Sequence, residues 1–169
     1  MSISQGAQAN LNGKVFEDMM IPIFKNNGFE VFTEAELKKK NPTFLENIER
    51  YVVKNATYVT IYKEGGRTEF VIVDGKRRVR VEAKYQASQG SVDEKYPYML
   101  LNGIYQYPEN EIIFVVDGGG YKPGAREWLK EHIDDNWLDY KSRGRDIKLM
   151  NIAEFVNWFN HEFARQKKN

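Results

Sequence analysis

The chain has 169 residues, 41% of them hydrophobic and 14% aromatic, which is enough for a substantial core, and we expect residues 1–169 to form one domain. Its formal net charge of +1 means that any affinity for nucleic acid must come from local clusters of charge. The absence of Cys excludes disulfides, zinc ribbons and cysteine nucleophiles. No signal peptide and no apolar run of about 18 residues is present, so we expect a cytoplasmic protein without a membrane span.

The N-terminal region predicts a helix followed by a short strand. Residues 1–10 are polar and predict a flexible tail, and an apolar stripe from about Asn12 to Asn27 predicts the helix. Glu17 lies near the edge of that stripe, where it could lean toward a site or face solvent. Phe29 to Phe32 has the pattern of a strand, whereas residues 34–50 are charged, mixed and interrupted by a proline.

A β-hairpin is the most informative feature of the sequence. Alternating β-branched and aromatic residues predict a strand over Tyr58 to Tyr62, and Gly65-Gly66 predicts the turn that leads into the hairpin. The hairpin runs from Thr68 to Gln86, with Asp74-Gly75 as a residue pair typical of a tight turn.

The second strand of this hairpin has one polar and one apolar face. Because strand side chains alternate with a period of two, one face carries Arg80, Glu82, Lys84 and Gln86, and the other carries Val79, Val81, Ala83 and Tyr85. A two-residue turn sets Glu69 opposite Arg80 and a four-residue turn sets it opposite Glu82, so both place Glu69 on the polar face. A three-residue turn would move Glu69 to the apolar face. We expect the polar face to be open to solvent.

The C-terminal half alternates helices and strands. Ser91 with Glu94 and Asn151 with Glu154 are capping-box patterns that predict helix starts. The expected elements are a helix from Ser91 to about Tyr107, a buried strand over Glu111 to Val116, a helix over Ala125 to Ile133, a strand over Ile147 to Met150 and a helix after Asn151. This order predicts an α/β domain with a mixed central β-sheet flanked by helices.

The polar face of the hairpin suits metal-dependent hydrolysis of a phosphodiester. Mg²⁺ prefers oxygen ligands and keeps several waters, so one or two carboxylates with a substrate phosphate oxygen are enough to hold it. Glu69 and Glu82 are the candidate metal ligands, and we expect Mn²⁺ to replace Mg²⁺. Lys84 lies two residues from Glu82 and can contact the scissile phosphate and the attacking water. Gln86 can orient the water or a phosphate oxygen.

These residues resemble the PD-(D/E)XK nuclease superfamily, whose restriction-endonuclease-like fold presents an acid on one strand and D/E-x-K on the next. Glu82-Ala83-Lys84 matches the D/E-x-K element. Thr68-Glu69 stands where Pro-Asp is most common, which keeps a carboxylate but lengthens its arm. The resemblance covers most of the chain and implies a Mg²⁺-dependent DNA endonuclease with Glu69, Glu82, Lys84 and Gln86 at its site. It also implies that Glu17, on the first helix, is an optional outer ligand.

Positive charge is clustered rather than spread. The candidate DNA-binding residues are Arg78, Arg80, Gln89 and Lys95, which lie on the hairpin or close after it. Further basic clusters are Lys38 to Lys40, Lys76 with Arg77, Lys141 with Arg143 and Arg145, and Arg165 with Lys167 and Lys168. Such clusters are more often a solvated surface than a set of phosphate contacts.

Other functions remain open from the sequence. A structure-selective Holliday-junction resolvase shares the fold and would be recognised by homodimerisation and by binding to branched DNA. A non-catalytic DNA-binding or assembly module would carry the same hairpin as a charged surface, because Glu-x-Lys is common on strands. RNA processing on this fold is a third alternative.

Overall fold

The structure is a computed structural model that describes residues 5–40, 43, 47–87 and 93–164. The helices are α1 (Gln5–Asn26), α2 (Glu34–Lys38), α4 (Tyr96–Tyr105), α5 (Pro123–Asp134) and α6 (Ile152–Glu162), with 3₁₀ turns at Asp93–Lys95 and Trp137–Arg143. The strands are β1 (Glu30–Thr33), β2 (Arg50–Val59), β3 (Gly65–Asp74), β4 (Arg77–Tyr85), β5 (Glu111–Asp117) and β6 (Asp146–Met150). Within these ranges no helix is long and apolar enough to cross a membrane.

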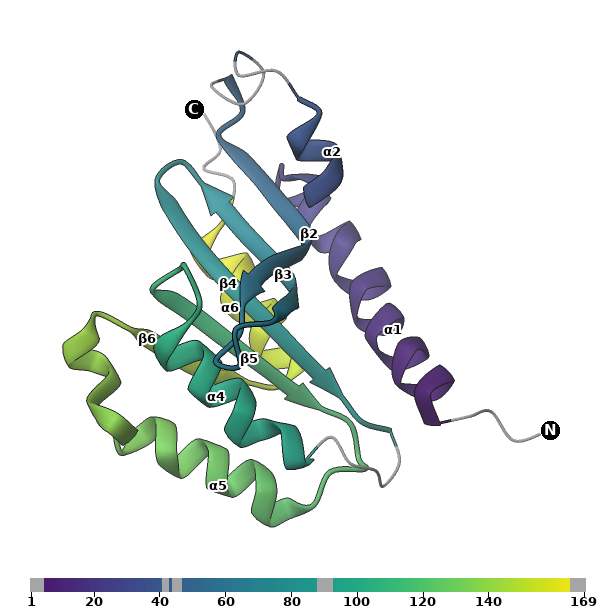
Figure 1. Cartoon of the computed structure of the whole chain (residues 1–169). Coiled ribbons are helices and arrows are strands. Elements are labelled where there is room, and N and C mark those ends of the chain that lie inside the picture. The colour runs from purple at the N-terminus through teal and green to yellow at the C-terminus, as the bar shows by residue number, and fades with distance from the viewer. Residues whose placement is uncertain (1–4, 41–42, 44–46, 88–92, 165–169) are drawn as a thin grey trace.

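A six-stranded mixed sheet in the order β1-β2-β3-β4-β5-β6 lies at the centre of the molecule (Figure 1). Strand β3 is antiparallel to both of its neighbours, β2 and β4, whereas β1 runs parallel to β2, and β4, β5 and β6 run parallel. The α4 helix connects β4 to β5, as parallel neighbours require a crossover. The predicted α/β fold with a mixed sheet flanked by helices is confirmed.

Helices cover both faces of the sheet. On one face, α1 and α6 bury aromatic side chains against β3, β4 and β5, among them Phe16, Phe24, Phe155 and Phe159. On the other face, α4 and α5 pack Leu100, Leu129 and their neighbours against β5 and β6. The α6 helix begins at the predicted capping box, in which the Asn151 and Glu154 side chains each accept a hydrogen bond from the other residue's backbone N–H at 2.8 Å.

Several element boundaries differ from those predicted. The α1 helix begins at Gln5, within the predicted tail, and α4 begins at Tyr96 after a 3₁₀ turn. The predicted cap at Ser91 lies outside the described residues. Strand β2 ends at Val59, so the predicted strand over Tyr58 to Tyr62 covers the end of β2 and the turn after it.

Gly65 and Gly66 lie inside β3, where the sequence predicted a turn. Gly66 is paired with Tyr58, and a Cβ at Gly66 would lie 2.6 Å from the Tyr58 ring. This glycine therefore permits a close approach of a ring to the backbone.

The hairpin turn consists of Gly75 and Lys76, one position later than predicted. Asp74 pairs with Arg77 as the last rung of the ladder, and Gly75 takes the left-handed conformation with φ of 58°. The register extends to Phe70 opposite Val81, and one further step brings Glu69 level with Glu82. Because the turn lies one position later than predicted, a two-residue turn places Glu69 opposite Glu82. The sequence predicted this alignment for a four-residue turn. Asp74 instead forms an ion pair with Arg50 at 2.9 Å.

Candidate active site

The regular alternation of side chains along β2 is interrupted opposite Glu69. Lys54 faces α1, because it forms an ion pair with Glu17, yet Ala56 packs on the opposite face with Val71 and Val73. Residues two apart in a regular strand share a face, so the strand reverses at Asn55, whose φ is 52°. Glu69 stands opposite Asn55 in the β2–β3 register, between the pairs Lys54–Phe70 and Ala56–Thr68. This reversal accompanies the end of regular pairing between β3 and β4.

Glu69 bridges the gap where β3 and β4 part. The ladder between these strands ends at Phe70 and Val81, so Ala83 is paired with β5 but not with β3. Oε2 of Glu69 accepts a hydrogen bond from the Ala83 backbone N–H at 2.6 Å. The other oxygen, Oε1, lies 4.0 Å from Nζ of Lys84. The Glu69 carboxylate is therefore fixed on the side of β4 that carries Lys84.

The Lys84 ammonium lies among three oxygens. Its Nζ is 2.8 Å from Oε1 of Glu82, 3.3 Å from the carbonyl oxygen of Ala83 and 4.0 Å from Oε1 of Glu69. A position surrounded by two carboxylates and a carbonyl is one that suits a cation. The structure therefore brings together Glu69, Glu82 and Lys84 as predicted from the hairpin.

Tyr107 fixes the Glu82 carboxylate from the segment after α4. The Tyr107 hydroxyl donates a short hydrogen bond to Oε2 of Glu82, and the Tyr58 ring packs edge-on against the Tyr107 ring at 4.7 Å. Only 8% of the Glu82 side chain is exposed, against 20% for Glu69 and 23% for Lys84. The prediction that this strand face is open to solvent is wrong at Glu82, because aromatic side chains distant in sequence cover it.

The charges of the site influence one another. Burial, assisted by the Glu82 charge, raises the pKa of Glu69 above its ordinary value, although Lys84 opposes this shift. Burial alone would lower the pKa of Lys84, but Glu82 and Glu69 together raise it above its ordinary value. Burial and the adjacent Glu82 also raise the pKa of Tyr107. One ammonium between two carboxylates leaves a net negative charge that a divalent cation would offset.

The donor set fits a hard divalent ion with few protein ligands. Within the described ranges no group of three or more His, Cys, Asp or Glu residues could hold a metal. Mg²⁺ does not require such a group, because it takes one or two carboxylates and fills its remaining positions with water and substrate oxygens. Glu69 and Glu82, with the Ala83 carbonyl beside them, provide oxygens of that kind.

Comparison with known families settles which fold family this arrangement represents. A model described as a PD-(D/E)XK nuclease superfamily domain matches residues 8–163. The chain belongs to the PD-(D/E)XK nuclease superfamily. No curated protein and no solved structure gives a match. Members of this superfamily typically are nucleases that use divalent metals, and the superfamily implies a nucleic-acid substrate.

Glu17 and Gln86 make contacts outside the cluster formed by Glu69, Glu82 and Lys84. Glu17 forms an ion pair with Lys54 at 2.8 Å. Gln86 is 3% exposed, and its Nε2 donates to the Gly120 carbonyl at 3.0 Å. Gln86 Oε1 is buried and has no hydrogen-bond partner among the residues that the structure describes. Gln86 therefore anchors the loop after β5.

The candidate DNA contacts lie in different environments. Arg80 is 2% exposed, pairs with Glu109 at 2.5 Å, and donates to Thr68 Oγ1 at 2.8 Å. It is a buried structural residue on the strand face expected to meet DNA, so it is not available to a phosphate. Arg78 and Lys95 are exposed. Gln89 lies outside the described residues.

The other basic clusters are partly committed to the fold. Arg77 pairs with Glu111 and Glu162 at 2.6 and 2.9 Å, and Arg145 donates to the backbone carbonyls of Tyr107 and Glu109. Lys38, Lys76, Lys141 and Arg143 are exposed. The predicted cluster of Arg165, Lys167 and Lys168 lies outside the described residues.

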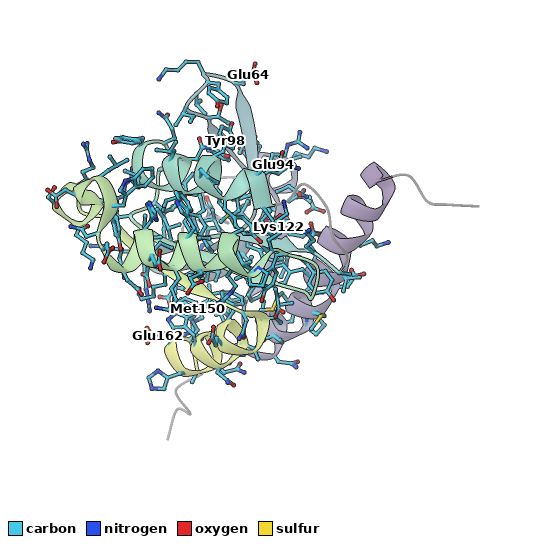
Figure 2. All side chains as sticks on the ribbon, turned by 90° about the horizontal axis from the view of Figure 1, so that it is seen from below. Glu64, Glu94, Tyr98, Lys122, Met150 and Glu162 are labelled. Carbon is cyan, nitrogen blue, oxygen red and sulfur yellow. The ribbon has the colours of Figure 1, made fainter. Side chains whose placement is uncertain are left out.

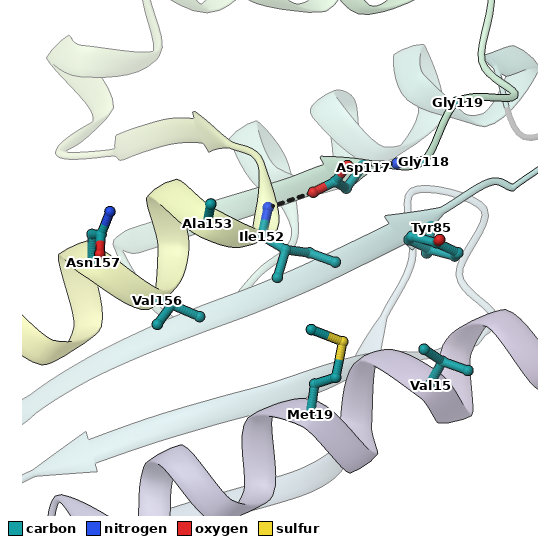
Figure 3. Close-up of a pocket in the computed structure, with 10 residues that line it drawn as sticks. All are labelled: Val15, Met19, Tyr85, Asp117, Gly118, Gly119, Ile152, Ala153, Val156 and Asn157. Carbon is teal, nitrogen blue, oxygen red and sulfur yellow. Dashed lines mark hydrogen bonds between the residues drawn. The ribbon is translucent and has the colours of Figure 1, made fainter.

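A separate apolar pocket lies on the opposite face of the sheet from Lys84, at the C-terminal end of β4. It lies between α1 and α6, and Figure 3 shows Tyr85 and the Asp117–Gly119 segment at its edge. Asp117 Oδ2 accepts a hydrogen bond from the Ile152 backbone N–H at 2.8 Å, which fixes the start of α6. The pocket residues include Val15, Met19, Ile152 and Val156, and none of the proposed site residues lines it.

Sequence reasoning missed the aromatic and ionic partners of the site. Tyr107 lies 25 residues after Glu82, and Glu109 lies 29 residues after Arg80. A single sequence carries no periodic signal that joins positions so far apart. Both residues lie in the short segment between the end of α4 and the start of the buried strand β5. Only the crossover from β4 to β5 brings them onto the hairpin.

Proposed function

We propose that the protein is a Mg²⁺-dependent endonuclease that hydrolyses phosphodiester bonds in DNA. The observation that carries the proposal is the convergence of Glu69, Glu82 and Lys84 at the point where β3 and β4 part. Membership of a nuclease superfamily supports a nucleic-acid substrate.

Each residue has a separate role in this proposal. Glu69 and Glu82 hold the ion, and the Ala83 carbonyl supplies a third oxygen beside them. When bound, Mg²⁺ supplies charge neutralisation at the phosphate and acidifies the attacking water. The Lys84 ammonium moves from the carboxylates to a phosphate oxygen as the substrate enters. Tyr107 keeps the Glu82 carboxylate in one orientation.

Glu17 and Gln86 do not belong to the proposed ligand set. Glu17 is neutralised by Lys54 on the α1 side of the sheet, and Gln86 is anchored to Gly120. Arg78 and Lys95 remain proposed phosphate contacts because their side chains are exposed.

The deciding experiment is a cleavage assay with supercoiled, linear, single-stranded and four-way DNA, in Mg²⁺, Mn²⁺ or EDTA. The wild type should cleave with either metal and not in EDTA. Glu82→Gln should abolish cleavage while circular dichroism still reports a folded protein. Glu94→Gln is the matched control, because Glu94 is an exposed acid outside the site, and it should cleave at the wild-type rate.

The substrate panel also separates the alternative functions. Cleavage confined to four-way DNA, by a dimeric protein, would identify a junction resolvase. Metal-independent DNA binding without cleavage of any substrate would identify a non-catalytic module. Cleavage by folded Glu82→Gln at the wild-type rate would refute the proposed site.

A further inference from the structure

A pair of stacked tyrosines joins the tip of the β2–β3 hairpin to α4. The Tyr62 and Tyr98 rings are 5.2 Å apart with an interplanar angle of 24°, and 69% of Tyr62 is exposed. Tyrosine is enriched at binding interfaces, because it combines a large ring with a polar hydroxyl.

The exposed ring is carried by a turn that hydrogen bonds hold in place. Thr60 N donates to the Glu64 carbonyl at 2.8 Å, and Lys63 takes a left-handed conformation with φ of 65°. The Ile61 N–H donates to Oδ1 of Asn102 on α4 at 2.9 Å, and Asn102 is fully buried. The turn is thus fixed to α4, and ordering Tyr62 on binding a ligand would cost little additional entropy.

Asn102 and Tyr107 connect this pair to the candidate active site. Tyr107 donates to Glu82, and the Tyr58 ring packs against Tyr107 at 4.7 Å. The Asn102 side chain donates to the Tyr98 carbonyl at 2.8 Å, and the Asn102 carbonyl accepts from the Tyr107 N–H at 3.0 Å. Tyr98 then stacks on Tyr62. The exposed pair is therefore only a few side chains from Glu82.

Charge around the pair is mixed in sign. Lys63, Arg67 and Lys95 are exposed near it, but so are Glu64 and Glu94. Figure 2 shows Tyr98 with Glu64 and Glu94 labelled on the same side of the molecule. A phosphate track requires a large excess of positive charge, whereas these side chains leave an excess of only one. An aromatic face suits a nucleobase, because every base has a π face that can stack on it.

We propose that Tyr62, supported by Tyr98, stacks on an unpaired nucleobase a few nucleotides from the scissile phosphate, so that the preferred substrate contains a single-stranded segment. This inference rests on the proposed nuclease function and adds a substrate class to it. A base inside a duplex is stacked on its neighbours and cannot offer its face to Tyr62, whereas an unpaired base can.

The test is fluorescence anisotropy in EDTA with a labelled single-stranded oligonucleotide and a duplex of the same sequence. Stacking of one base contributes about 1–3 kcal/mol, so Tyr62→Ala should weaken single-strand binding by roughly 5- to 150-fold. Tyr62→Phe should bind as the wild type does, because it keeps the ring. Tyr105→Ala is the matched control, since Tyr105 is an exposed tyrosine of α4 whose ring lies under Arg143, and it should change affinity less than twofold.

An oligonucleotide with abasic positions separates stacking from phosphate contacts, because it keeps the charge and loses the bases. The wild type should bind it as weakly as Tyr62→Ala binds the intact strand, and Tyr62→Ala should lose nothing further. Equal losses on duplex and single strand, or wild-type affinity for Tyr62→Ala, would overturn the proposal. Loss of self-association without loss of oligonucleotide binding would instead mark a protein interface.

The same variants distinguish failure of this inference from failure of the nuclease proposal. If Tyr62→Ala cleaves and binds single strands as the wild type does, the nuclease stands and the stacking role is refuted. If the wild type cleaves nothing but binds single strands through Tyr62, the stacking role stands and the nuclease is refuted.

Discussion

The hydroxyl of Tyr107 donates a hydrogen bond to Oε2 of Glu82, and this bond leaves Oε1 of the carboxylate facing Lys84. Removing the hydrogen-bond partner of a metal ligand typically lowers metal affinity by about 10- to 100-fold. We therefore expect Tyr107→Phe to raise the Mg²⁺ concentration needed for half-maximal cleavage by about tenfold, with a smaller effect on the rate at saturating Mg²⁺.

Tyr140→Phe is the control for this Mg²⁺ titration. The buried Tyr140 hydroxyl donates to the Ile133 carbonyl at 2.7 Å, away from the site, so this variant loses a comparable hydrogen bond. It should leave the Mg²⁺ dependence unchanged. An identical titration for Tyr107→Phe and the wild type would show that Tyr107 does not position Glu82.

Glu69 makes the metal-free protein sensitive to pH. Because burial raises the folded-state pKa of Glu69 above its ordinary value, stability from this group is lost as pH rises from that ordinary value through the raised pKa. Glu69→Gln removes the charge, and its amide oxygen can still accept from the Ala83 N–H. In EDTA the variant should melt at a higher temperature than the wild type near pH 7, and at the same temperature near pH 4. Scanning fluorimetry across this range measures the difference.

Metal addition should reverse that order at neutral pH. A ligand that binds only the folded state raises its stability, and Mg²⁺ would be held by Glu69 in the wild type. We expect Mg²⁺ to raise the melting temperature of the wild type near pH 7 and to leave that of Glu69→Gln unchanged. An equal gain in both proteins would place the ion elsewhere.

Arg80 should matter for stability rather than for DNA affinity. It is buried with Glu109, and removing one partner of a buried pair costs about 3–5 kcal/mol because the other charge is left unpaired. We expect Arg80→Ala to lower the free energy of unfolding in urea by that amount. Arg78→Ala, an exposed neighbour, should change it by less than about 0.5 kcal/mol. A stable Arg80→Ala variant with weakened DNA binding would support the opposite assignment.

Lys84 should affect chemistry more than binding. Its ammonium offsets charge that develops in the transition state, so Lys84→Ala should lower the cleavage rate by orders of magnitude. DNA affinity should fall only by the contribution of about one phosphate contact. Lys95→Ala, which removes an exposed lysine outside the site, should lower affinity without a comparable loss in rate. Parallel losses in rate and affinity for Lys84→Ala would mark Lys84 as a tether.

The core of the candidate site could be predicted from the sequence because it depends on local rules. A period of two fixes Glu82 and Lys84 on one face of β4, and a short even-numbered turn places Glu69 on that face. The Asn151 and Glu154 cap was predictable for the same reason, since its two residues are three positions apart.

Features that depend on distant segments could not be predicted. The burial of Arg80 and Glu82 is produced by Glu109 and Tyr107, which the chain brings back only after α4. The reversal at Asn55 occurs opposite Glu69 of the neighbouring strand. Neither relationship leaves a periodic pattern in one sequence.

The most direct test of the proposed metal site is anomalous scattering from Mn²⁺ in crystals of the wild type and of Glu82→Gln. The proposal predicts an Mn²⁺ peak in the wild type within about 2.1 Å of carboxylate oxygens from both Glu69 and Glu82, the distance at which Mg²⁺ binds oxygen, and no such peak in the variant at the same concentration. Mn²⁺ bound only at other positions, under conditions in which the wild type cleaves DNA, would contradict it.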